Sequence, residues 1–189
     1  MARPIVLFDA CVFYPARLRD LLLRIAKSDL FRARWTDRIH DEWIDALLAR
    51  RPDISRERLQ RTRALMDAAV PDCLVTDYER LIEDLLLPDP RDRHVLAAAI
   101  CCQASVIVTM NARDFPASRV GQYGISVQHP DEFLASLFEL HPAAICEAVR
   151  GMRANLTHPS RSVSELLDDL RQVGLAATVR ELESMQSLL

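Results

Sequence analysis

The stretch Leu87–Phe115 has the most informative pattern of polar and apolar positions in this chain. It begins with an acidic, proline-containing loop that no helix can continue through, because proline fixes φ and restricts the residue before it. Asp89 or Asp92 can cap the helix that follows. Val95–Cys102 is apolar and rich in small residues, which predicts a helix packed closely against a sheet. Ala104–Thr109 contains Val-Ile-Val and predicts a strand buried on both faces of a parallel sheet.

The first 140 residues alternate short apolar runs with helical patterns. Ile5–Phe8 is an apolar run typical of a strand. Pro15–Lys27 predicts a helix, because its leucine and isoleucine residues recur on one face. The other predicted strands are 33–36 and 125–127, and the other predicted helices start at Asp37, span 55–69 and 78–86, and open at Pro130. This alternation favours an α/β fold with a parallel sheet.

The character of the chain changes after about residue 140. Pro142–Ala154 and Val163–Leu189 have helical patterns and are separated by a polar break, Asn155–Ser162. No strand followed by a carboxylate recurs in this region. We therefore predict an α/β domain at residues 1–140 and a helical extension at 141–189, which packs on the domain or carries a partner.

Composition sets modest bounds on function. The chain has 189 residues, half of them hydrophobic, and a formal net charge of −3, which is ordinary for a globular domain. Because there is no overall basic signature, binding to nucleic acid must be argued from a local patch. The five cysteines form no CxxC pair and indicate small buried side chains in a reducing compartment. The sequence shows neither a signal peptide nor an apolar run of about 18 residues, so we expect a cytoplasmic protein without a membrane partner.

Acidic residues lie beside the predicted buried strands and helices. Asp9 ends the first strand, Asp92 precedes the buried helix, and Asp114 follows the next strand, where open α/β sheets bind their ligands. Glu42 lies at the edge of a helix core face and can reach inward to a metal ion or outward to water; the other acids favour the metal. Mg²⁺ and Mn²⁺ prefer oxygen ligands, and a bound cation offsets the repulsion between clustered carboxylates. The pattern therefore indicates a metal site that activates water and neutralises a phosphodiester.

Other chemistries have weaker support in the sequence. Asp9-Ala10-Cys11 suggests a haloacid-dehalogenase phosphatase, but Cys11 replaces the second Asp that this chemistry uses. No Ser or Cys nucleophile with a fitting base is evident, and the four glycines form no phosphate-binding loop. His94 could be a proton shuttle, a substrate contact or neither. The arginine-dense region 50–63 could contact RNA or an acidic partner segment, or could simply be solvated.

The chain resembles the PIN-domain ribonucleases, in particular the VapC-like toxins of bacterial toxin–antitoxin pairs. The resemblance covers roughly residues 4–140 and lies in the segments IVLFDACVFYP, WTDRIHDEW, DPRDRHVLAAAI and VTMNARDFP. It implies a PIN-like three-layer α/β/α fold with a central, mainly parallel sheet, to which the C-terminal helical extension is added. Asn111 stands where some family members carry an Asp.

The resemblance also implies a function and a set of site residues. The protein would be a metal-dependent endoribonuclease using Mg²⁺ or Mn²⁺, with RNA as substrate, a cognate antitoxin as partner and a homodimer as a common assembly. The catalytic and metal-binding residues would be Asp9, Glu42, Asp92 and Asp114. The auxiliary polar residues would be Asn111, Thr109, Thr36, Asp89 and His94. The arginines on the flanking phosphates would be Arg91, Arg93 and Arg113. A PIN-like module that has lost catalysis and binds RNA or protein is the second hypothesis, and a phosphatase of another α/β fold is the third.

Overall fold

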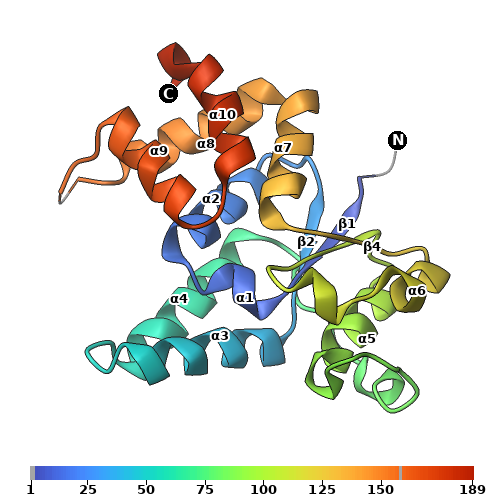
Figure 1. Ribbon diagram of the computed structural model, residues 1–189. Coiled ribbons are helices and arrows are strands. Elements are labelled where there is room, and N and C mark those ends of the chain that lie inside the picture. The colour runs from blue at the N-terminus through green and yellow to red at the C-terminus, as the bar shows by residue number, and fades with distance from the viewer. Residues whose placement is uncertain (1–2, 158) are drawn as a thin grey trace.

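A four-stranded parallel sheet forms the centre of the computed structural model, which describes residues 3–157 and 159–189 (Figure 1). The strand order is β2-β1-β3-β4, and the strands are β1 (Ile5–Phe8), β2 (Arg32–Arg34), β3 (Val106–Val108) and β4 (Ser126–Gln128). Leu7 in β1 lies opposite Arg34 in β2 and Ile107 in β3. Because all strand pairs are parallel, their carboxyl ends meet at one edge of the sheet.

Helices cover both faces of this sheet. The helices are α1 (Ala10–Phe13), α2 (Ala16–Ala26), α3 (Asp37–Arg50), α4 (Arg56–Ala69), α5 (Arg93–Cys101), α6 (Ala117–Val120), α7 (Pro130–Leu140), α8 (Pro142–Ala154), α9 (Val163–Gln172) and α10 (Ala176–Ser184). Short 3₁₀ turns are η1 (Glu79–Leu81), η2 (Pro90–Asp92), η3 (Ala112–Asp114), η4 (Gly121–Tyr123) and η5 (Gln186–Leu188). Helix α5 packs against β1 and β3, while α2 and α7 lie on the other side of the sheet (Figure 1). This confirms the predicted three-layer α/β/α architecture.

Local sequence signals account for the positions of most elements. The Ser55 hydroxyl accepts a hydrogen bond from the Arg58 amide and so caps α4, as the serine predicts. The aromatic ring of Phe8 on β1 lies 6.1 Å from that of Phe133 on α7, which joins the sheet to this helix. Gly174, at φ 92°, separates α9 from α10, because other residues rarely adopt this backbone conformation.

The predicted helix at 78–86 is wrong. Only the 3₁₀ turn η1 forms there, although Tyr78 and Leu85 are both buried. The segment lies between Asp77, which has a left-handed backbone at φ 62°, and the proline-containing loop that begins at Pro88. A helix this short is marginal without help from a cap, and Tyr78 provides no side-chain cap hydrogen bond. Burial of the two apolar side chains therefore fixes this segment without a regular helix.

The five cysteines are all free thiols, as expected, but they are not uniformly buried. Cys73 and Cys146 are buried, whereas Cys101 is exposed. Cys11 and Cys102 are partly exposed. None of the helices in the described part of the chain is long and apolar enough to span a membrane.

The C-terminal helices pack on the α/β domain through α7 and α2. Helix α10 lies against α7, and α8 lies against α2. Asp131 on α7 accepts hydrogen bonds of 2.8 Å from the amides of Ala177 and Thr178 in the first turn of α10. The Thr178 hydroxyl also donates to the same carboxylate, at 2.8 Å. A carboxylate on α7 thus caps the N-terminus of α10, although the two helices are far apart in sequence.

Replacing Asp131 by alanine should destabilise the fold by about 1–2 kcal/mol, because it leaves the first amides of α10 without their acceptor. Urea unfolding of the full chain measures this change. Asp168→Ala is the matched control, since Asp168 belongs to an exposed ion pair with Arg171 and its loss should change stability by well under about 1 kcal/mol. Equal effects of the two substitutions would contradict the capping role of Asp131.

Candidate active site

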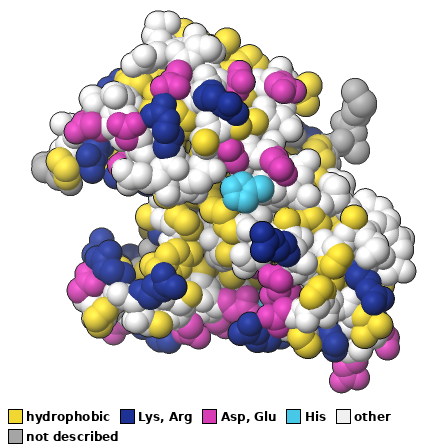
Figure 2. Space-filling model, in the orientation of Figure 1, with side chains coloured by type: hydrophobic (Ala, Val, Ile, Leu, Met, Phe, Trp, Pro, Cys, Tyr) yellow, Lys and Arg dark blue, Asp and Glu magenta, His cyan; other side chains and the backbone are white. Residues whose placement is uncertain are grey.

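An open cleft of about 700 Å³ lies at the carboxyl edge of the sheet. Figure 2 shows acidic side chains gathered near the middle of this face, below the C-terminal helices. The acidic residues that line the cleft are Asp9, Glu42, Asp89, Asp92 and Asp114, and Asn111 and Arg91 lie beside them. They come from β1, α3 and two 3₁₀ turns, so the fold gathers carboxylates that are far apart in sequence.

Asp9 is the most firmly held of these carboxylates. It follows the last residue of β1 and is only 7% exposed. One carboxylate oxygen, Oδ1, accepts a hydrogen bond from the Ala10 amide at 2.7 Å. The other oxygen, Oδ2, accepts one from the Thr109 hydroxyl, also at 2.7 Å. Thr109 is fully buried just past β3 and in turn accepts from the Asn111 amide at 3.0 Å. The ends of two neighbouring strands therefore fix the orientation of Asp9.

Cys11 adds a third donor to Asp9. Its Sγ lies 3.2 Å from Asp9 Oδ2 and accepts a hydrogen bond from the Met110 amide at 3.2 Å. Burial and the negative charge of Asp9 raise the pKa of the thiol to about 12. The thiol is therefore protonated near neutral pH and acts as a donor, which excludes it as a nucleophile.

The environment of Asp92 disfavours the ionised form of its carboxylate. Burial, together with the charges of Asp9, Asp89 and Asp114, raises its pKa to about 6. Asp92 ends η2 and precedes α5, so a buried helix positions it. A carboxylate under this repulsion favours a bound cation.

Asp89 and Arg91 form a closed pair at the rim of the cleft. The Arg91 guanidinium donates to both carboxylate oxygens of Asp89, and the Arg91 amide donates to Asp89 Oδ1 at 2.8 Å. These hydrogen bonds hold the pKa of Asp89 below its usual range. The Arg91 side chain is thus engaged within the protein, although it is highly exposed.

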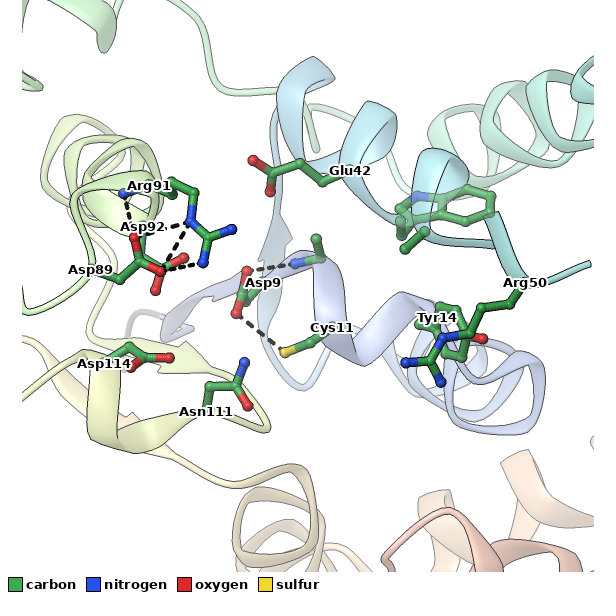
Figure 3. Close-up of a pocket in the computed structure, with 13 residues that line it drawn as sticks. Asp9, Cys11, Tyr14, Glu42, Arg50, Asp89, Arg91, Asp92, Asn111 and Asp114 are labelled. Atoms are coloured by element: carbon green, nitrogen blue, oxygen red, sulfur yellow. Dashed lines mark hydrogen bonds and ion pairs between the residues drawn. The ribbon is translucent and has the colours of Figure 1, made fainter. Parts of the chain in front are cut away.

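Glu42 is positioned by a buried histidine. His94 Nε2 lies 2.9 Å from Glu42 Oε1. His94 is 1% exposed, and its Nδ1 is buried without a hydrogen-bond partner in the described structure. Arg38 Nε also donates to Glu42 Oε1, at 3.4 Å. The carboxylate of Glu42 lies on the cleft wall, across from Asp92 and Asp9 (Figure 3).

The donor set suits a hard divalent cation. Within residues 3–157 and 159–189, no group of three or more His, Cys, Asp or Glu side chains is arranged to hold a metal ion by itself. Mg²⁺ does not require such a cage, since it usually keeps several waters and uses one or two carboxylates together with substrate phosphate. The residues present therefore fit a partly hydrated ion.

Comparison with known protein families identifies the family of this chain. A family model described as "PIN domain" matches residues 5–113, which is more than half of the chain. The chain belongs to the PIN-domain family. A second family model, described as "VapC50 C-terminal domain", matches residues 130–184. The chain is also 34% identical, over 116 residues, to "Putative ribonuclease VapC50" of Mycobacterium tuberculosis (strain ATCC 25618 / H37Rv). That alignment covers 60% of this chain and 69% of the relative. No solved structure matches.

The PIN-domain cleft brings together only some of the residues expected from the sequence. The four expected carboxylates, Asn111, Asp89 and Arg91 all line it. Thr109 and His94 act behind this lining, through Asp9 and Glu42 respectively. Thr36, Arg93 and Arg113 do not line the cleft. The Thr36 hydroxyl instead caps α3, where it accepts a hydrogen bond from the Ile39 amide at 3.1 Å.

The structure of this PIN domain also shows lining residues that sequence reasoning did not select as site residues. Cys11, Tyr14 and Trp43 face the cleft, as does Arg50, which the sequence indicated only as part of the arginine-dense region 50–63. The sequence could have indicated Cys11 as a cleft residue, because it lies two residues after Asp9 at the start of a turn. No local signal links Tyr14 to Arg50, because packing of α1 against α3 brings them together.

Substitution of Asp92 by asparagine should stabilise the protein at pH 7.5 in the presence of EDTA. The folded pKa of about 6 exceeds the ordinary value of 3.8, so stability falls as pH rises between these values, and the penalty is complete above about pH 6. A shift of this size corresponds to at most about 3 kcal/mol, and solvent around the partly exposed carboxyl reduces the expected gain to about 1 kcal/mol. Urea unfolding at pH 4 and 7.5 measures the gain, which should vanish at pH 4.

Asp89→Asn is the control with the opposite sign. Hydrogen bonds from Arg91 lower the pKa of Asp89, so its ionised form stabilises the fold above the usual carboxyl pKa. This variant should be less stable than the wild type at pH 7.5. An Asp92→Asn variant that also loses stability at pH 7.5 would show that repulsion does not dominate the environment of Asp92.

Proposed function

We propose that this protein is a metal-dependent endoribonuclease and the toxin of a toxin–antitoxin pair. The observation that carries the proposal is the convergence of Asp9, Glu42, Asp92 and Asp114 on one cleft at the carboxyl edge of a parallel sheet. The raised pKa of Asp92 supports it, because like charges gathered without a cation are costly. Membership of the PIN-domain family and the similarity to a relative named as a ribonuclease support the choice of RNA.

The acidic residues of the cleft would bind the metal ion, and the polar groups around them would complete or support this site. Asp9 and Asp92 hold the principal Mg²⁺ or Mn²⁺, with Glu42 as a ligand either directly or through water. Asp114 and Asn111 complete the polar lining on the opposite wall. Thr109 and His94 are positioning residues, since Thr109 donates a hydrogen bond to Asp9 and His94 contacts Glu42, both from buried positions.

The reaction is hydrolysis of an RNA phosphodiester. A water oxygen bonds to phosphorus, and the bond from phosphorus to one sugar oxygen breaks in line with it. When bound, the metal ion lowers the pKa of water and neutralises charge on the phosphate. The hydrogen bonds from Ala10 and Thr109 hold the Asp9 carboxylate in place for this ion, and Asp92 would bind it as a carboxylate.

The toxin assignment adds further partners. A cognate antitoxin would block the cleft, and a homodimer is a common assembly of such toxins. Both proteins would act in the cytoplasm. The match to the C-terminal family model supports the assignment to this subgroup.

A catalytically inactive PIN-like module that binds RNA or protein is the second candidate. Such a module would need no group of three metal ligands, and the described residues contain none. Retention of the repelling carboxylates argues against it, because an inactive module gains nothing from their cost in stability.

Purified protein should cut RNA into discrete fragments in the presence of Mg²⁺ or Mn²⁺. Asp9→Asn should reduce the rate by at least about 100-fold, because it removes one charge from the principal ligand pair. The assay uses total cellular RNA, with EDTA as the metal-free control. Asp29→Asn is the matched control, since this exposed carboxylate pairs with Arg3 and lines neither the cleft nor the groove beside it. RNA that stays intact with either metal, while the protein still binds it, would favour the inactive module.

Divalent metal should also stabilise the protein against heat at pH 7.5. An ion bound at about 100 times its dissociation constant adds about 2.7 kcal/mol to the free energy of unfolding. Asp92→Asn should abolish most of this gain, whereas Asp29→Asn should retain it. Differential scanning calorimetry measures both effects, with scans in the absence of Mg²⁺ and at about 100 times its dissociation constant. A gain that Asp92→Asn leaves unchanged would locate the bound ion outside the cleft.

A further inference from the structure

We propose that Tyr14 and Arg50 form the binding site for the RNA nucleotide next to the scissile phosphate. The inference rests on the proposed function and adds the direction in which the strand leaves the catalytic carboxylates. It assigns base stacking to the Tyr14 ring and a phosphate contact to the Arg50 guanidinium.

Tyr14 and Arg50 lie together at one end of the cleft. Figure 3 shows them side by side, with Asp89, Asp92 and Asp114 at the opposite end and Asp9 between. The guanidinium carbon of Arg50 is 5.9 Å from the centroid of the Tyr14 ring, which is within the range of a cation–π contact. Both side chains are at least partly exposed. An aromatic face and a cation are therefore presented together to an incoming ligand.

Arg50 has no acidic partner in the described structure, in contrast to Arg91 in the same cleft lining and to its neighbour Arg51. Arg91, the other arginine in the cleft lining, is held by Asp89. Next to Arg50 in sequence, Arg51 donates to both carboxylate oxygens of Asp53. A phosphate that binds Arg50 therefore does not have to displace a carboxylate, whereas a phosphate that binds Arg91 or Arg51 does.

The surface beyond Tyr14 can accept the continuing strand. A second groove, of about 490 Å³, shares Tyr14 with the cleft and is lined by Arg51 and Arg58. Arg19 also lines this groove, but its guanidinium donates to the Phe13 carbonyl and lies 4.8 Å from the centroid of the Trp43 ring. Figure 2 shows a hollow on the left of this face, between the C-terminal helices and α3 and α4. Asp53 lines the same groove and pairs with Arg51, so it is the exposed Arg58 that offers the continuing strand a cation away from the carboxylates.

Charge favours this end of the cleft over the other. The end formed by Asp89, Asp92 and Asp114 repels any phosphate that a metal ion does not neutralise. A strand with its scissile phosphate at Asp9 and Asp92 is thus drawn toward Arg50. Tyr14 matches a single strand, because an unstacked base offers a face to an aromatic ring and a paired base does not.

The test measures binding of a fluorescently labelled single-stranded RNA by anisotropy, with EDTA present and Asp92→Asn as the background variant. Arg50→Ala and Tyr14→Leu should each raise Kd about tenfold, while Arg50→Lys and Tyr14→Phe should stay within about threefold of the background. Arg50→Ala should also reduce the slope of log K against log salt by about 0.7, because one phosphate contact is lost. Tyr14→Leu should leave this slope unchanged.

Arg56→Ala is the matched control. It removes the same charge at the start of α4, six residues after Arg50, but Arg56 pairs with Asp45 and lines neither groove, so Kd should not change. Unfolding curves confirm that each variant is folded. Cleavage by the otherwise wild-type protein is measured in parallel with the same substitutions at Tyr14 and Arg50.

The outcomes separate this inference from the proposed function. Active wild-type protein whose Kd and cleavage rate are insensitive to Tyr14→Leu and Arg50→Ala would overturn the nucleotide site and leave the ribonuclease intact. Wild-type protein that neither binds nor cuts RNA would overturn the proposed function and the nucleotide site with it. Equal losses of binding in Arg50→Ala and Arg56→Ala would attribute the effect to net charge and also overturn the site.

Discussion

The hydrogen bond from Thr109 to Asp9 joins the ends of the two central strands, and the rest of the site depends on it. At 2.7 Å and with Thr109 fully buried, it fixes Asp9 Oδ2, while the Ala10 amide fixes Oδ1. Because β1 and β3 are parallel neighbours, a residue just past each strand must lie at the same edge of the sheet. The fold thus supplies a rigid first carboxylate, and the 3₁₀ turns bring Asp92 and Asp114 to it.

The arrangement of charge around Asp9 explains why the cleft is polarised. Three neighbouring acids and burial raise the pKa of Asp92, so the acidic end carries negative charge that the protein itself only partly compensates. Arg91 neutralises Asp89, and His94 contacts Glu42. Both of these carboxylates lie at the outside of the acidic cluster. The centre of the cluster is left for a cation, and Arg50, at the far end, is left for an anion.

The sequence predicted those parts of the fold and site that depend on local patterns. Val106–Val108 is β-branched and buried between helices, and Ser55 caps a helix, so both could be placed without coordinates. Thr36 was selected because it is polar and near the metal-binding segment, yet the backbone of α3 uses its hydroxyl. Tyr14 and Arg50 could not be paired, since their proximity depends on how α1 packs against α3, and such packing has no signature in either segment.

Helix α3 makes the spacing between the two ends of the cleft rigid. Glu42, Trp43 and Arg50 all line the cleft from this helix, and the eight residue steps from Glu42 to Arg50 span about 12 Å at the usual helical rise. His40, fully buried on the same helix, accepts a hydrogen bond from Trp43 Nε1 on its Nδ1, so its proton resides on Nε2 and points at Asp67, 2.8 Å away. Burial lowers the pKa of His40, which keeps the ring neutral and this arrangement in place near neutral pH. Asp67 also accepts from Trp35 Nε1, so the network ties α3 to α4 and to the end of β2. A helix held in this way fixes how far a phosphate at Arg50 lies from a phosphate at the carboxylates, and this distance, rather than any base-edge contact, would select an extended single strand.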